Sequence, residues 1–100
     1  MLSKIELFNA KNAGKKIEEG IQFTVTSIGC FTDTDKDGKP VEVSALKTDD
    51  GAIYTTISAT IRDSLDMLDD ILSDNGSVRV QVVQNKSNSG RDFYMLKIVD

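Results

Sequence analysis

The sequence predicts a single, mainly β domain that carries one amphipathic helix. Its 100 residues match the common size of one domain. Apolar and polar residues alternate with period two in five segments, as is typical of half-buried strands. From Ile61 to Leu72 the period changes to the 3.6 residues of a helix. We therefore expect three strands, a helix and two further strands, in that order.

The first predicted strand is long and starts near residue 21. Apolar residues alternate with polar ones from Ile21 to Val25, and the apolar phase then continues at Ile28 and Cys30. Because this change of phase lies next to Gly29, we expect a β-bulge there and a bend in the strand. An inert, buried thiol is expected for Cys30.

Two Asp-Gly turns separate the next strands. Residues 32–40 read TDTDKDGKP and predict a hairpin loop, and Asp50-Gly51 predicts a second turn. The strands that follow these turns, residues 41–46 and 53–57, complete an antiparallel meander. The side chains expected to face outward on these two strands are Glu42, Ser44, Leu46, Tyr54 and Thr56.

The hairpin loop also matches the first half of an EF-hand calcium loop, D-x-D-x-D-G, from Asp33 to Gly38. Position 12 of such a loop would be Ser44 instead of a bidentate Glu, and the flanking segments are strands. We interpret the segment as an Asp-rich turn, and we expect no metal site and no cofactor.

The predicted helix has an apolar stripe and an acidic outer face. The stripe consists of Ile61, Leu65, Leu68 and Leu72, and the outer face of Asp63, Asp66, Asp69 and Asp70. Thr60 and Asp63 predict a capping box at its start, and Asn75-Gly76 predicts its end. Two alternating segments, residues 78–83 and 93–98, predict the last strands on either side of a polar loop at residues 85–90.

This order of elements, with a long bent first strand, predicts a five-stranded Greek-key OB-fold barrel with its helix between strands three and four. The OB-fold domain would cover residues 21–100. Residues 1–20 would form an N-terminal extension or an extra strand. A split-sheet α+β sandwich or a partly open roll would give a similar order, and both alternatives stay open.

The composition excludes several classes of function. The chain has no His and one Cys, so it offers no zinc site of thiolates and imidazoles, no disulfide framework and no His-based catalytic dyad. No apolar run approaches the roughly 18 residues of a membrane span, and the N-terminus does not resemble a signal peptide. We therefore expect a protein of the cytoplasm, that of the host if a phage encodes it, and one that is not an enzyme.

The charges are distributed unevenly. The chain has 16 acidic and 12 basic residues, a formal net charge of −4. Residues 58–75 contain five of the acids and one of the bases, so the rest of the chain contains 11 of each. A basic groove can therefore exist opposite an acidic helix, because the field depends on where the charges lie.

OB-folds bind oligonucleotides across strands two and three, between the loop that joins strands one to two and the loop that joins strands four to five. The candidate nucleic-acid-binding residues lie on this surface and on the adjoining strand five. Bases stack on aromatic rings, and Lys and Arg neutralise phosphates. The candidates are Phe31, Lys36, Lys39, Tyr54, Lys86, Arg91, Phe93 and Lys97.

The layout resembles the small phage-type single-stranded DNA-binding proteins, and the filamentous-phage type has the nearest layout. The similar features are Gly38-Lys39-Pro40 after the bent strand, a Tyr in the third strand, and a last segment that reads GRDFYMLKI, residues 90–98. The resemblance covers residues 21–99. It implies base stacking and phosphate binding by Phe31, Lys39, Tyr54 and Arg91. The sequence differs from that family in its acidic helix, its fewer aromatic residues and its acidic net charge.

The leading hypothesis is a sequence-tolerant single-stranded DNA-binding protein that acts in phage or mobile-element DNA replication. Its partners would be single-stranded DNA and other replication proteins, with no membrane contact, and homodimerisation stays open. The alternative is an acidic protein-interaction module, such as a phage accessory or inhibitor protein, whose Asp-rich helix binds a basic partner.

Overall fold

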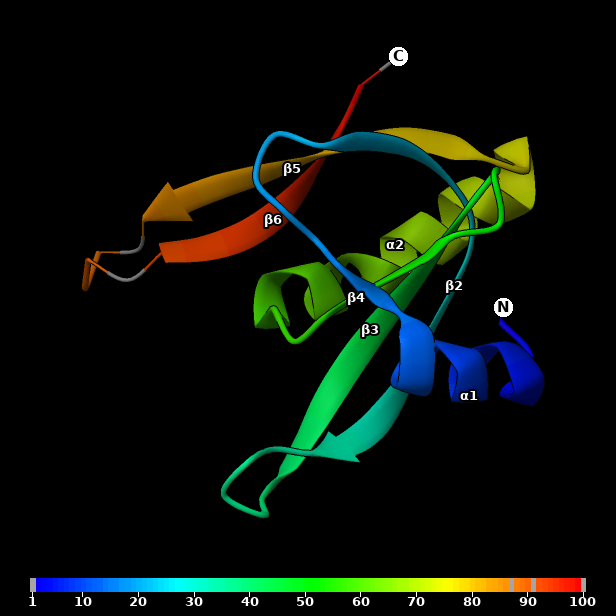
Figure 1. Cartoon of the computed structure of the whole chain (residues 1–100). Helices are drawn as coiled ribbons and strands as arrows, with labels where there is room; N and C mark the ends of the chain where they lie inside the picture. Colours follow the sequence, from blue (N-terminus) through cyan, green and yellow to red (C-terminus); the bar gives the residue numbers. More distant parts are fainter. Residues whose placement is uncertain (1, 87, 91, 100) are drawn as a thin grey trace.

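The computed structural model describes residues 2–86, 88–90 and 92–99. Six strands form one sheet that curls into a half-barrel, and two helices pack against it (Figure 1). The elements in chain order are α1 (Lys4–Ala13), β1 (Lys15–Lys16), β2 (Gln22–Thr34), β3 (Pro40–Thr48), β4 (Ile53–Thr56), α2 (Ala59–Asn75), β5 (Val78–Lys86) and β6 (Asp92–Ile98). The predicted mainly β class is confirmed. The described part of residues 21–100 contains five strands and one helix in the predicted order, and residues 1–20 add the short strand β1 and a helix, α1, that was not predicted.

The long strand β2 connects the two halves of the sheet, whose order is β1-β4-β3-β2-β5-β6. It pairs with β5 from Gln22 to Val25 and with β3 from Val25 to Thr34, both antiparallel. Figure 1 shows the strong curve of β2 that these two partners require. The predicted bend is confirmed, but the register shift lies between Val25 and Ser27, and the prediction of a bulge at Gly29 is wrong.

Gly29 makes room for the N-terminal segment. It pairs in regular register with Ala45. A Cβ at Gly29 would lie 3.0 Å from Leu7 Cδ2 and 3.2 Å from Leu2 Cβ, so a side chain would push this segment away from β2. The neighbouring Cys30 is exposed, because residues 30–34 of β2 lie beyond the buried part of the strand. The prediction of a buried thiol is therefore wrong.

Apolar contacts cover both faces of the sheet. The larger core lies between the sheet and the buried stripe of α2. Its buried members are Phe23, Val25, Ile28, Leu46, Val78, Val80 and Val82 from the strands, Ile61, Leu65 and Leu68 from α2, and Ile17. A second cluster of Leu2, Ala10 and Ala45, with Leu7, Phe31 and Ile53 packed against it, includes the inner side of α1. The strands β2 to β4 therefore contribute apolar side chains to two separate layers.

The two faces of β3 were assigned incorrectly from the sequence. Ser44 and Leu46, which were expected to face outward, are 1% and 0% exposed. Leu46 belongs to the larger core, while the neighbouring Ala45 belongs to the cluster under α1. Alternation separates the two faces of a strand, but it does not say which face meets the main core when both carry apolar residues.

The boundaries of α2 differ from the prediction only at its start. Ser58 is the N-cap, because its Oγ accepts a hydrogen bond from the backbone N–H of Ile61 at 3.3 Å. The capping box predicted at Thr60 is therefore wrong. The predicted end is confirmed: Gly76 has φ +77°, and its N–H donates to the carbonyl of Leu72 at 2.8 Å.

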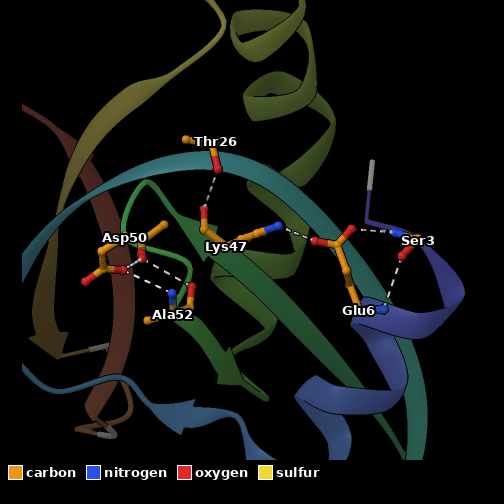
Figure 2. Close-up of polar contacts among 7 residues, drawn as sticks. Ser3, Glu6, Thr26, Lys47, Asp50 and Ala52 are labelled. Carbon is orange, nitrogen blue, oxygen red and sulfur yellow. Dashed lines mark hydrogen bonds and ion pairs between the residues drawn. The ribbon is translucent and has the colours of Figure 1, made fainter.

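Polar contacts anchor α1 to β3 (Figure 2). Ser3 and Glu6 form a capping box: Ser3 Oγ accepts from the N–H of Glu6 at 3.2 Å, and Glu6 Oε1 accepts from the N–H of Ser3 at 3.1 Å. Glu6 Oε2 accepts from Lys47 Nζ at 2.5 Å. The hydrogen bond from Lys47, and next that from the Ser3 N–H, hold the pKa of Glu6 below its ordinary value of 4.5.

Loss of this ion pair is expected to weaken the fold in acid. Because the pKa of Glu6 is lower in the folded than in the unfolded chain, its contribution is present above pH 4.5 and is lost as the pH falls through the folded value. We expect Glu6→Gln to cost about 1 kcal/mol or less at neutral pH and to flatten the pH dependence of stability below pH 4.5. Thermal unfolding followed by circular dichroism would measure both, with the exposed Glu19→Gln as control. An unchanged pH dependence in Glu6→Gln would contradict the prediction.

Candidate nucleic-acid interface

An open groove lies where the end of β4 and the start of α2 approach β6. Its volume is about 560 Å³, and its lining also includes residues from α1, β1, β2 and β3. In Figure 1 the β2–β3 and β5–β6 hairpins project from the body of the molecule, and the start of α2 lies between them. The groove is therefore the open seam of the half-barrel, with one hairpin contributing to each wall.

Two of the predicted aromatic residues meet in this groove. Phe31 on β2 and Phe93 on β6 both line it, and both are partly buried. Ile57, which follows β4, lines the same groove and is 68% exposed. Aromatic and apolar side chains open to solvent at this position offer a surface on which flat, weakly hydrated rings can stack.

Tyr54 is not part of this groove. Its ring stacks on Phe23 with centroids 4.7 Å apart and an interplanar angle of 12°, and it packs against the larger core. The prediction that Tyr54 faces outward is therefore wrong, for the same reason as at Leu46. Tyr54 also lines a second cavity of about 420 Å³, together with Lys15 and Lys16.

Lysines from the first 20 residues line the main groove. Lys11 at the end of α1 and Lys16 on β1 are both part of its lining. Lys11 Nζ lies 3.8 Å from Asp33 Oδ1, and this pair is largely solvent-exposed. Neither lysine was among the predicted site residues. The basic pair at residues 15–16 is visible in the sequence, but its place beside the groove depends on the parallel pairing of β1 with β4.

The other predicted cations lie on the hairpins. Lys36 and Lys39 are exposed in the β2–β3 loop, Lys86 is exposed at the end of β5, and Lys97 is exposed on β6. These four are not among the described residues that line the groove. Arg91 lies outside the described residues.

The β2–β3 loop is the turn that its sequence predicted. Asp35 Oδ1 accepts from the N–H groups of Asp37 and Lys39, each at 2.9 Å, and Gly38 has φ +81°. The Asp-rich segment thus uses a carboxylate to shape the hairpin that carries Lys36 and Lys39.

Ser58 joins the start of α2 to β6 at the edge of the groove. Its Oγ donates to the carbonyl of Tyr94 at 2.7 Å and also accepts from the N–H of Ile61. One side chain therefore ties the start of α2 to β6, directly beside Phe93.

Asp33 and Asp92 also line the groove, so its charge is mixed. Within residues 2–86, 88–90 and 92–99, no cluster of three or more His, Cys, Asp or Glu side chains could hold a metal ion. Neither helix in the same part of the chain is long and apolar enough to cross a membrane.

The half-barrel combines aromatic side chains in an open groove with lysines on the neighbouring hairpins, and these are the residue types that contact single-stranded nucleic acids. The sequence matches the family model of the Phi29-type phage single-stranded DNA-binding protein over residues 1–99. The chain belongs to this family. The resemblance to phage-type single-stranded DNA-binding proteins is thereby confirmed, but the family is the Phi29 type and not the filamentous-phage type. The match also includes the first 20 residues, which that resemblance did not cover.

Three relatives carry the name single-stranded DNA-binding protein. That of Bacillus phage PZA is 29% identical over 104 residues, which cover 95% of this chain and 84% of the relative. That of Bacillus phage phi29 is 28% identical with the same coverage. That of Bacillus phage B103 is 29% identical and covers 96% of this chain and 86% of the relative. No solved structure matches the chain significantly.

Proposed function

We propose that this chain binds single-stranded DNA without sequence preference, in the groove between the β2–β3 and β5–β6 hairpins, during phage DNA replication. The observation that carries the proposal is that Phe31 on β2 and Phe93 on β6, which are far apart in the sequence, line one open groove. The names of the three phage relatives, all single-stranded DNA-binding proteins, support single-stranded DNA as the ligand. The role is binding without catalysis, in the host cytoplasm and beside other replication proteins.

The proposed binding unit is an OB-fold of β2 to β6 with α2, residues 21–100. The order of these elements and the shared strand β2 support this assignment. Residues 1–20 are then an N-terminal extension that adds α1, β1 and two groove lysines. In an OB-fold of this layout the two hairpins are the loops between which a single strand lies.

In the proposed mechanism, aromatic side chains contact the base of each nucleotide and basic side chains contact its phosphate. Bases stack on Phe31 and Phe93, and each stack contributes about 1 to 3 kcal/mol. A ring presents the same face to every base, so this contact tolerates any sequence, whereas in a duplex the bases are already stacked. The cations proposed to contact phosphates are Lys11, Lys16, Lys36, Lys39, Lys86, Arg91 and Lys97.

A second contact is proposed at Tyr54. Phe23 occupies one face of its ring, so a base would stack on the other face, in the cavity that Tyr54 shares with Lys15 and Lys16. Tyr54 then serves both the core and the ligand. Tyr54→Phe, which keeps the stack on Phe23, is therefore the variant that separates its hydroxyl from its ring.

Fluorescence polarisation of a labelled dT oligonucleotide tests the proposed function. An oligonucleotide of about 10 nucleotides falls within the roughly 4 to 16 nucleotides that one OB-fold covers. We expect binding that weakens between about 50 and 200 mM salt, and weaker binding to a duplex of the same length. No binding at the lower salt concentration, or equal affinity for the duplex, would contradict the proposal.

Removal of single lysines is expected to reduce the salt dependence of binding. Each phosphate contact contributes about −0.7 to the slope of log K against log salt on single strands. Lys16→Ala in the groove and Lys39→Ala in the β2–β3 hairpin should each flatten the slope by about this amount. Lys4→Ala is the control, because Lys4 is exposed on α1 and is not among the described residues of the groove lining. Equal slopes in all three variants would remove Lys16 and Lys39 from the site.

A further inference from the structure

The outer face of α1 is apolar. Ile5 is 75% exposed and Phe8 is 66% exposed, while Leu7 and Ala10 of the same helix pack inward. Residues three apart on a helix are surface neighbours, so Ile5 and Phe8 form one patch, which we call the α1 apolar face. Lys4 and Lys11 flank Phe8 at four and three positions. Large exposed apolar side chains grouped in this way mark interaction surfaces.

The outer face of α2 has the complementary character. Met67 is 70% exposed on the side of the helix opposite the buried stripe. Four exposed carboxylates lie on the solvent side of the same helix, and with Met67 they form what we call the α2 acidic face: Asp63, Asp66, Asp70 and Asp74. In the part of the chain that the structure describes, one ion pair reaches this face, from Arg62 Nε to Asp63 Oδ1 at 3.9 Å.

We propose that the α1 apolar face of one copy of this chain binds the α2 acidic face of the next copy on the same DNA strand. Ile5 and Phe8 then pack against Met67, and Lys4 lies among the carboxylates. The proposal rests on the proposed function, because the DNA strand brings the copies together. We infer a second copy as the partner because this one chain carries both surfaces of the contact, the α1 apolar face and the α2 acidic face.

The charges favour contact between the α1 apolar face of one copy and the α2 acidic face of another. Two α1 apolar faces against each other would bring Lys4 and Lys11 of both copies together, and two α2 acidic faces would bring eight carboxylates together. Only the contact of α1 with α2 joins opposite charges. Such a contact uses different surfaces on the two copies, so it leaves one free surface at each end and can continue along a strand.

The contact is too small to hold a dimer in free solution. Stable interfaces bury about 1,200 to 2,000 Å², whereas this one centres on three apolar side chains. Two copies bound side by side on one strand experience an effective concentration in the millimolar range, at which a weak contact is populated. We therefore expect association on DNA long enough for several copies, and monomers without DNA.

The test compares a dT oligonucleotide of about 10 nucleotides, which holds one copy, with one of about 60 nucleotides. For the wild-type chain we expect tighter binding per site on the long strand. The double variant Ile5→Ser/Phe8→Ser should keep wild-type affinity for the short strand and lose about tenfold on the long one. Met67→Ser, on the other helix, should give the same pattern. The test therefore remains possible if the double variant does not fold.

An exchange of charges between Lys4 and Asp66 tests the contact most directly. Lys4→Glu alone and Asp66→Lys alone should each lower the ratio of long-strand to short-strand affinity. Both changes in the same chain should restore the ratio, since the interface again joins opposite charges. If Lys4 and Asp66 served only the fold of one copy, each substitution would change the affinity for the short and the long strand by the same factor. The ratio of the two affinities would then stay at its wild-type value in all three variants.

Two results would overturn the inference. One is equal affinity per site on short and long strands for the wild-type chain. The other is a wild-type ratio in Ile5→Ser/Phe8→Ser and Met67→Ser. Absence of binding to the short strand by the wild-type chain is a different failure, because it contradicts the proposed function itself and the inference with it.

Discussion

Replacement of both Phe31 and Phe93 by Leu is expected to lower the affinity for a short dT oligonucleotide by about 100-fold. Leu keeps an apolar side chain of similar size in the groove but removes the flat ring. Two lost stacks at the lower part of the range of about 1 to 3 kcal/mol each account for this factor. Each single variant should lose about tenfold. No other substitution proposed for the groove is expected to have so large an effect on binding.

The control for these variants is Phe8→Leu, which removes an exposed ring from α1, outside the described groove lining. It should bind the short oligonucleotide like the wild-type chain. Thermal unfolding of all variants would show whether the fold is kept, since Phe31 also packs on the cluster under α1. Wild-type affinity in the folded double variant would exclude the groove as the binding site.

Leu46→Ala is expected to cost about 2 to 5 kcal/mol of folding free energy. The side chain is 0% exposed and lies in the larger core, so its removal leaves a cavity between β3 and its neighbours. A domain of this size is stabilised by about 5 to 15 kcal/mol, so the loss is a large fraction of the total. Urea unfolding would measure it.

Glu42→Ala is the matched control, because Glu42 lies on the same strand and was expected to face the same way as Leu46. Glu42 is exposed, and its carboxylate accepts a hydrogen bond from Thr32 Oγ1 at 2.8 Å. We expect a change of about 0.5 kcal/mol or less from this substitution. Similar small effects of both substitutions would mean that Leu46 is not in the core.

Elements with a strong local signal could be predicted well from the sequence. The buried stripe of α2 and its Gly76 end were predicted correctly, because the 3.6-residue period and the C-terminal glycine are local properties. The hairpin at Gly38 and the turn at Gly51 were also correct, since both glycines adopt the positive φ that these turns need.

The helix α1 was missed because its outer face, and not only its inner face, is apolar. Ile5 and Phe8 point to solvent, so the segment shows no clean amphipathic stripe. A usable signal did exist in the sequence: Ser3 and Glu6 have the S-x-x-E spacing of a capping box, and both hydrogen bonds of that box form.

The candidate site was only partly predictable. Phe31 and Phe93 were selected by residue type and by position on the expected topology, and both do line one groove. Lys11 and Lys16 could not be selected, because their place beside the groove depends on where α1 packs and on the pairing of β1 with β4. Tyr54 was selected for a face of β4 that instead packs on Phe23.

The sequence by itself determined the mainly β class, the turns, the long bent strand β2 and the helix α2, because each depends on the preferences of residues close together in the chain. Only the tertiary structure decided which face of β3 and β4 meets the main core, because α1 covers the other face with a second apolar layer. The groove, too, was decided only by the tertiary structure. Its lining comes from segments far apart in the chain, and the hydrogen bond from Ser58 Oγ to the carbonyl of Tyr94 joins the start of α2 to β6 beside it.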